Sequence, residues 1–134
     1  TLAGPYVPTA CQQLAVRALE ADENEAASAG LRDEFAGRRR YAAGQLRALG
    51  LAPAVPAAGY FLWVPVGGLG LTGRAFADRL LKECGVRVGP GDVYGPAAAG
   101  HVRVSVAADD GRLREGLARL TGFVAGLTGK PVVK

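Results

Sequence analysis

Apolar residues recur at the 3.6-residue spacing of a helix in four segments of the chain. The sequence therefore predicts helices over residues 10–20, 25–49, 74–83 and 111–127. Thr9, with Gln12 three positions later, has the pattern of a capping box before the first helix. Thr72 is expected to cap the third helix, and Gly50 and Gly85 are expected to end the second and the third.

The same spacing predicts which side of each helix faces a core. The expected inward positions of the second helix are Leu31, Phe35, Ala42, Leu46 and Leu49. Those of the last helix are Leu113, Leu117, Leu120, Val124 and Leu127, following acidic residues at 109 and 110 that favour a helix start. The first helix carries an alanine-rich apolar stripe, which we expect to leave apolar surface exposed and to favour self-association.

Three short segments are rich in β-branched or aromatic residues and are predicted strands: 60–64, 86–88 and 101–106. The first is apolar on both faces, which predicts a central place in its sheet. The order helix, helix, strand, helix, strand, strand, helix predicts an α+β fold. We expect a two-layer α/β arrangement in which helices cover one face of a small three-stranded sheet.

The last predicted strand places a single charged side chain on an otherwise small-residue face. Val102, Val104 and Val106 alternate toward the core, so Arg103 points to the other face. A guanidinium is costly to bury without an anion, and its planar fork matches a carboxylate. A carboxylate-binding site at Arg103 is one interpretation; the other is a half-exposed arginine bonded to a neighbouring side chain or to loop carbonyls.

Composition narrows the classes of function. The 134 residues are 49% hydrophobic, so the chain can bury a core, and no apolar run is long enough to cross a bilayer. No signal-peptide pattern is present, and we expect a cytoplasmic location unless a leader has been removed. Two distant cysteines and one histidine favour no metal site. The run Arg38–Arg40 is interpreted as a solvated helix face or a partner contact rather than a nucleic-acid site.

The sequence contains no methionine and begins at Thr1. We therefore expect the chain to be a piece of a longer polypeptide, although removal of an initiator methionine would also leave Thr1.

Four pieces of the chain, in order, resemble the C-terminal segment of class I/II pyridoxal-phosphate aminotransferases of fold type I. They are the Pro8–Gln13 helix start, the helix with Arg38–Tyr41 that ends in Leu49-Gly50, the strand Pro56–Trp63, and the tail from Gly85–Gly91 through Tyr94-Gly95 to Val102–Ser105. The resemblance spans roughly residues 5–127. The tail is also similar to that of aminotransferases acting on succinyl-diaminopimelate in amino-acid biosynthesis, and to aspartate- and aromatic-type relatives.

The resemblance implies roles for four residues. Arg103 matches the arginine that binds the α-carboxylate of the amino-acid substrate. Gly59 and Tyr60 match the strand that borders the substrate, and Tyr94 matches an aromatic residue near the site; packing is the alternative for these three. The glycine-rich loop over residues 89–100 does not match a phosphate-binding motif, because it leads into no helix.

The resemblance also implies which parts of such an enzyme this chain lacks. The lysine that binds pyridoxal 5'-phosphate, and the other cofactor-binding residues, belong to a large domain that would precede Thr1. Lys82, Lys130 and Lys134 do not match that lysine. We therefore expect no catalytic and no cofactor-binding residue in this chain, and no transamination by it alone.

The implied organisation is a lead-in with part of a connecting helix over residues 1–30, and an aminotransferase small domain over 31–134. The implied partners are an amino-acid or 2-oxo-acid substrate, the large cofactor domain of the same polypeptide and a second copy in a homodimer. Two alternatives stay open. One is a standalone carboxylate- or amino-acid-binding module without catalysis, and the other is a binder of nucleic acid or an acidic partner through Arg38–Arg40.

Overall fold

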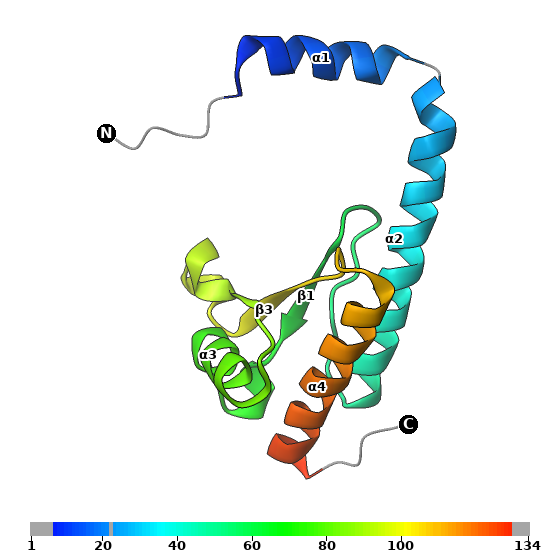
Figure 1. Cartoon of the computed structure of the whole chain (residues 1–134). Helices are drawn as coiled ribbons and strands as arrows, with labels where there is room; N and C mark the ends of the chain where they lie inside the picture. Colours follow the sequence, from blue (N-terminus) through cyan, green and yellow to red (C-terminus); the bar gives the residue numbers. More distant parts are fainter. Residues whose placement is uncertain (1–6, 22, 130–134) are drawn as a thin grey trace. The chain divides into compact units, whose positions relative to one another are not determined.

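The computed structural model describes residues 7–21 and 23–129, and the side chains of all of these except 23–27 (Figure 1). The chain divides into two compact units, Thr1–Glu34 and Phe35–Lys134. The helices are α1 (Thr9–Glu20), α2 (Glu23–Ala48), α3 (Gly73–Cys84) and α4 (Asp110–Thr128). The strands are β1 (Phe61–Pro65), β2 (Gly89–Pro90) and β3 (His101–Ser105), in the chain order predicted from the sequence.

In the first unit, α1 has no buried residue, and its apolar side chains are exposed as expected; Leu14 is 66% and Leu19 88% accessible. The predicted capping box is wrong. Pro8 occupies the N-cap position with an extended backbone, so the helix begins at Thr9 and no side chain caps it. The Gln12 side chain instead donates to the Val7 carbonyl at 2.8 Å. The ring of Pro8 fixes its φ at a value that suits an N-cap residue with extended backbone. The helix therefore begins one position earlier than a cap at Thr9 would predict.

In the second unit, the sheet has the order β1-β3-β2, and both pairs are antiparallel. Figure 1 shows β1 and β3 side by side. The predicted central place of the 60–64 segment is therefore wrong, because β3 is the central strand and β1 lies at an edge. On the second face of β1, which is half-buried, Trp63 packs on Tyr94 and His101, and Arg103 lies over Phe61. Beyond β1, only an isolated bridge between Ala54 and Trp63 extends the pairing among the described residues.

The predicted strand over residues 86–88 is also misplaced. Val88 is buried in the core but belongs to no strand, and the pairing with β3 starts one residue later, at Gly89 opposite Arg103. Pro90 then faces Val102, and a proline is tolerated there because β2 is an edge strand with one side free of hydrogen bonding.

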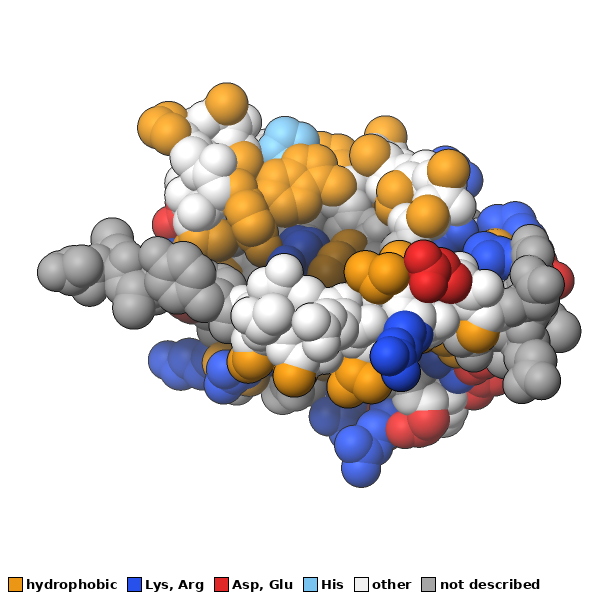
Figure 2. Space-filling view, turned by 90° about the horizontal axis from the view of Figure 1, so that it is seen from above, with side chains coloured by type: hydrophobic (Ala, Val, Ile, Leu, Met, Phe, Trp, Pro, Cys, Tyr) orange, Lys and Arg blue, Asp and Glu red, His pale blue; other side chains and the backbone are white. Residues whose placement is uncertain are grey.

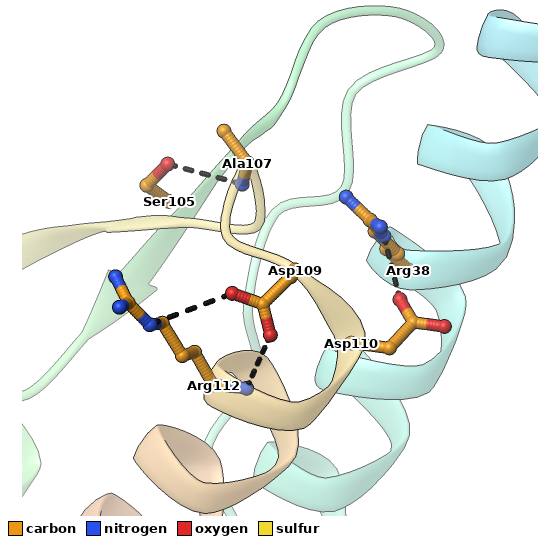
Figure 3. Close-up of polar contacts among 6 residues, drawn as sticks. All are labelled: Arg38, Ser105, Ala107, Asp109, Asp110 and Arg112. Carbon is orange, nitrogen blue, oxygen red and sulfur yellow. Dashed lines mark hydrogen bonds and ion pairs between the residues drawn. The ribbon is translucent and has the colours of Figure 1, made fainter.

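The helix ends of the second unit follow the sequence prediction. Thr72 Oγ1 accepts a hydrogen bond from Ala75 N at 3.1 Å at the start of α3. Gly85 ends that helix in the left-handed conformation, with φ 69°. At the start of α4, the Asp109 carboxylate accepts from Arg112 N at 3.0 Å (Figure 3). The adjacent α2 and α4 are joined there by an ion pair between Arg38 and Asp110 at 2.9 Å.

The core lies between one face of the sheet and the helices α2, α3 and α4. Leu62, Val64, Val102 and Val104 line that face of the sheet and are buried. The inward residues of the predicted helix stripes join them from residue 35 onward, with Phe35 and Leu127 only partly buried, whereas Leu31 is 53% exposed. Leu31 belongs to the first unit, whereas the residues of this core belong to the second.

The loop between β2 and β3 forms two 3₁₀ turns, η2 (Gly91–Tyr94) and η3 (Pro96–Ala98), rather than the irregular segment expected. It packs tightly: a Cβ on Gly91 would lie 2.7 Å from the carbonyl oxygen of His101 and closer still to that of Ala98. Within the described part of the chain, no helix is both long enough and apolar enough to cross a bilayer.

Candidate functional site

The face of the sheet that does not line the core carries the candidate site. In the antiparallel register, Trp63 of β1 pairs directly with Arg103 of β3, and Phe61 pairs with Ser105. Paired residues point to the same face, so Phe61, Trp63 and Arg103 lie together there. Arg103 is half-buried, and its guanidinium carbon lies 4.0 Å from the centre of the Phe61 ring. The strand alternation inferred from the sequence therefore places Arg103 on the face away from the core.

A glycine leaves room beside the guanidinium. Gly89 pairs with Arg103 from the other side, on β2, and a Cβ there would lie 3.5 Å from Arg103 Cβ and 3.6 Å from its Nε. The space next to these residues is a hollow of about 480 Å³. Its walls include Phe61, Arg74, Asp78, Arg87, Gly89, Arg103 and Ser105, so one acidic side chain also borders the hollow. The hollow can admit a small molecule to Arg103.

The charges around the hollow leave Arg103 available. Within the residues that the structure describes, no carboxylate forms an ion pair with Arg103. Arg74, which lines the same hollow, is instead paired with Asp92 through two contacts of 3.1 and 3.2 Å. A half-buried guanidinium without a protein anion is a chemical match for a carboxylate ligand.

Aromatic side chains form one wall of the site. The Tyr94 ring meets the Trp63 ring edge to face at 5.5 Å and lies 5.6 Å from the Arg103 guanidinium carbon. Trp63 also stacks on His101 at 5.4 Å, and Figure 2 shows hydrophobic side chains gathered around the pale-blue histidine. A guanidinium over ring faces is stabilised by the ring quadrupole, and the rings restrict where it can move.

The other two sequence-predicted residues lie beside this group. Tyr60 is 44% exposed and packs on Phe61 at 4.5 Å and on Phe35 at 5.8 Å. Gly59 adopts a left-handed φ of 81° in the loop before β1. The structure thus brings Arg103 and Tyr94 together, while Tyr60 meets the site through the Phe61 ring, and Gly59 lies in the loop that leads to it.

The sequence interpretation missed Phe61, Trp63 and Gly89 as parts of the site. Phe61 and Trp63 are two residues apart in a predicted strand, so they share a face, but the register that sets them against Arg103 cannot be read from either strand alone. Gly89 was assigned only to the glycine-rich loop over residues 89–100 and to the Gly85–Gly91 part of the resemblance.

Of the two interpretations of Arg38–Arg40, the solvated helix face is wrong for two of the three residues, and the partner contact stays a prediction. Arg39 is 5% exposed and donates to the carbonyls of Ala57 and Gly59. Arg38 pairs with Asp110 across the start of α4 (Figure 3), and only Arg40 remains on an exposed side. Helical periodicity alone could not show that a loop and a second helix cover this part of α2. With two of its guanidiniums engaged, the run is a poor nucleic-acid site.

Comparison with known proteins agrees with these features. Residues 2–120 match the family model "Aminotransferase class I and II". The chain is 32% identical over 117 residues to the LL-diaminopimelate aminotransferase of Dehalococcoides mccartyi, covering 87% of the chain and 29% of that protein. It is 42% identical over 81 residues to the arginine–pyruvate transaminase AruH of Pseudomonas aeruginosa, covering 60% of the chain and 21% of that protein.

The fold is similar to that of solved structures as well. The aromatic aminotransferase from Pyrococcus horikoshii OT3 superposes with a TM-score of 0.76 at 29% identity, over 82% of the chain and 29% of that structure. The chain thus spans between a fifth and a third of the length of these proteins. Because the family model covers nearly the whole chain, the protein belongs to the class I and II aminotransferases.

Proposed function

We propose that this chain is the C-terminal part of a pyridoxal-phosphate-dependent aminotransferase, and that Arg103 binds the α-carboxylate of its amino-acid or 2-oxo-acid substrate. Residues 31–134 form the small domain in this proposal, and residues 1–30 form a lead-in and part of the helix that connects it to a large domain. The observation that carries the proposal is the Arg103 guanidinium, held beside a hollow with no acidic partner among the described residues.

The surrounding residues support a carboxylate-binding role. Phe61 lies under the guanidinium and Tyr94 near it, and Arg103 lines the hollow together with Gly89. A planar carboxylate can accept two parallel hydrogen bonds from such a fork, which fixes the orientation of the substrate as well as its position. The rings also exclude water from one side of the pair, which strengthens the electrostatic attraction.

In this proposal, residues of this chain do not bind pyridoxal 5'-phosphate. Lys82 is exposed on α3 and does not line the hollow, and Lys130 and Lys134 lie outside the described residues. When bound, the cofactor supplies the electron sink for amino-group transfer. In this proposal it is bound by a large domain outside this chain, so the 134 residues alone do not transaminate. A homodimer, as the family resemblance implies, is part of the same proposal.

The relatives' names include different amino acids, namely LL-diaminopimelate and arginine, together with the aromatic class. The α-carboxylate is common to all of these amino acids. The proposal therefore assigns to Arg103 the recognition of this shared group and not the choice of side chain.

The test is steady-state kinetics of the longer aminotransferase that contains this segment, with Arg103→Ala and Arg103→Lys. Removing one partner of a desolvated charge pair costs about 2–5 kcal/mol, which corresponds to a loss of roughly 30- to 5,000-fold in kcat/KM for Arg103→Ala. Lysine keeps the charge but not the fork, and is expected to lose less. Arg47→Ala, at an exposed position near the end of α2, is the control. We call the proposed binding of the substrate carboxylate by Arg103 the carboxylate clamp. Unchanged kcat/KM in both Arg103 variants would refute this clamp.

Calorimetry on the 134-residue chain separates this proposal from the alternative of a standalone binding module. An enzyme part that lacks its cofactor domain is expected to bind L-aspartate or 2-oxoglutarate negligibly. Binding of either compound that disappears in Arg103→Ala would instead support a module that keeps the carboxylate site without chemistry.

A further inference from the structure

Arg39 is a buried charge that the proposed carboxylate site does not itself use. It projects from α2 and is 5% exposed. Its Nη2 donates to the Ala57 carbonyl at 2.9 Å, and its Nη1 donates to the Gly59 carbonyl. The two nitrogens of one planar fork therefore bind two carbonyls of one loop, on either side of Ala58.

The partners of Arg39 are unusual for a buried guanidinium. Within the described residues, no carboxylate pairs with Arg39, whereas its neighbour Arg38 pairs with Asp110. Burying a charge against neutral carbonyls is costly compared with an apolar side chain of the same size. What the fork provides, and an apolar side chain would not, is directional hydrogen bonding that fixes the loop backbone.

That loop leads directly to the floor of the candidate site. Gly59 has a left-handed φ of 81°, a Cβ built on it would meet no atom within 4 Å, and its carbonyl accepts the hydrogen bond from Arg39. The next residue, Tyr60, accepts a hydrogen bond from Val106 N at 2.8 Å. Phe61 follows, and its ring lies 4.0 Å under the Arg103 guanidinium.

We propose that Arg39 is a positioning residue for the Arg103 site: by binding the carbonyls of Ala57 and Gly59 it fixes the start of β1, and thereby the Phe61 ring that supports Arg103. The inference rests on the proposed carboxylate-binding function of Arg103. Arg39 touches neither the substrate hollow nor Arg103 in this role. It acts through Gly59, Tyr60 and Phe61, which run from the loop into β1.

The first test is the NMR spectrum of the 134-residue chain. A guanidinium side chain stacked on a ring shows upfield ring-current shifts, so Arg103 side-chain protons report its contact with Phe61. We expect Arg39→Met to lose more than half of that shift, and Arg40→Met, a matched change at the exposed neighbour, to keep it. Phe61→Leu, which deletes the ring, calibrates complete loss. Arg39→Lys keeps the charge on a single donor nitrogen but not the fork, and is expected to give an intermediate shift. It replaces Arg39→Met in this test if that variant does not fold.

The second test is kinetics of the longer aminotransferase, in which loss of a positioning residue should raise KM and leave kcat nearly unchanged. Arg39→Met is expected to raise KM for the amino acid about tenfold, equivalent to one weakened hydrogen bond at the clamp, with kcat within about twofold. A general loss of structure would instead lower kcat and the fraction of active enzyme.

The outcomes separate the two proposals. Suppose that both Arg39 variants keep the native ring-current shift and an unchanged KM, while Arg103→Ala still impairs the enzyme. This result overturns the role of Arg39 and leaves the clamp intact. Unchanged kinetics in the Arg103 variants would refute the clamp, and the role of Arg39 would then fail with it.

Discussion

The two faces of the β1–β3 pair are built from the same ten residues but follow different rules. One face consists of Leu62, Val64, Val102 and Val104, which are buried in the core with no polar atom to satisfy. The opposite face carries Phe61, Trp63 and Arg103, all half-buried, with the charge lying over a ring. The comparison teaches that alternation in a strand predicts which residues share a face. It does not predict whether the second face is buried, solvated or reserved for a ligand.

The largest expected effect comes from shortening neighbouring side chains of β1, one on each face of the sheet. Leu62→Ala opens a cavity in the core and should lower the free energy of unfolding by about 2–5 kcal/mol. Phe61→Leu, one residue earlier on the other face, is expected to cost less than about 1.5 kcal/mol. Urea unfolding of both variants measures the contrast. Equal losses would mean that the site face is as tightly packed as the core.

Two glycines at the site end of the sheet offer a similar contrast. Gly91→Ala places a Cβ against the carbonyls of Ala98 and His101, which cannot move without shifting the loop, so a loss of about 1–3 kcal/mol is expected. At Gly89 a Cβ would meet Arg103 at 3.5 Å, an ordinary contact, and Gly89→Ala should leave the thermal midpoint nearly unchanged. In the longer enzyme it should weaken substrate binding by narrowing the space beside the guanidinium. A lower midpoint for Gly89→Ala than for Gly91→Ala would reverse this assignment.

A smaller effect is expected at the cap of α3, which packs on the core side of the sheet. Thr72→Ala removes the acceptor for Ala75 N and should cost about 1 kcal/mol. Thr72→Ser keeps the hydroxyl and is the matched control, which should retain most of the stability. Thermal unfolding measures both, and equal midpoints for the two variants would show that the hydrogen bond contributes little.

The smallest effect is the pH dependence contributed by Asp109 at the start of α4. The backbone N–H of Arg112, and then the Arg112 charge, lower the pKa of this exposed carboxyl (Figure 3). Because the folded pKa lies below the unfolded one, the contribution is complete above the unfolded pKa of about 3.9 and is lost as pH falls through the folded pKa. Asp109→Asn keeps a capping oxygen and should flatten this part of the stability profile. A profile with the same slope in both proteins would exclude Asp109 as its source.

Much of the local structure could be read from residue types. Thr72, Gly85 and Asp109 occupy the cap positions that their side chains or backbone freedom predict, because capping depends on a few neighbouring atoms. The failed prediction at Thr9 has an equally local reason, since Pro8 takes the cap position first. Arg103 could be nominated from alternation alone. Its neighbours could not, because cross-strand partners are set by register.

The sequence by itself determined the order of helices and strands, the core faces of β3 and α4, and the presence of one arginine on the face away from the core. These depend on periodicity and on short-range sterics, which act within a few residues. Only the tertiary structure decided that β3 is the central strand, that Phe61 supports Arg103, and that Arg39 is buried against the loop before β1. The contacts of Arg39 with Ala57 and of Phe61 with Arg103 join residues 18 and 42 positions apart, and such contacts are selected by how the whole core packs rather than by any local pattern.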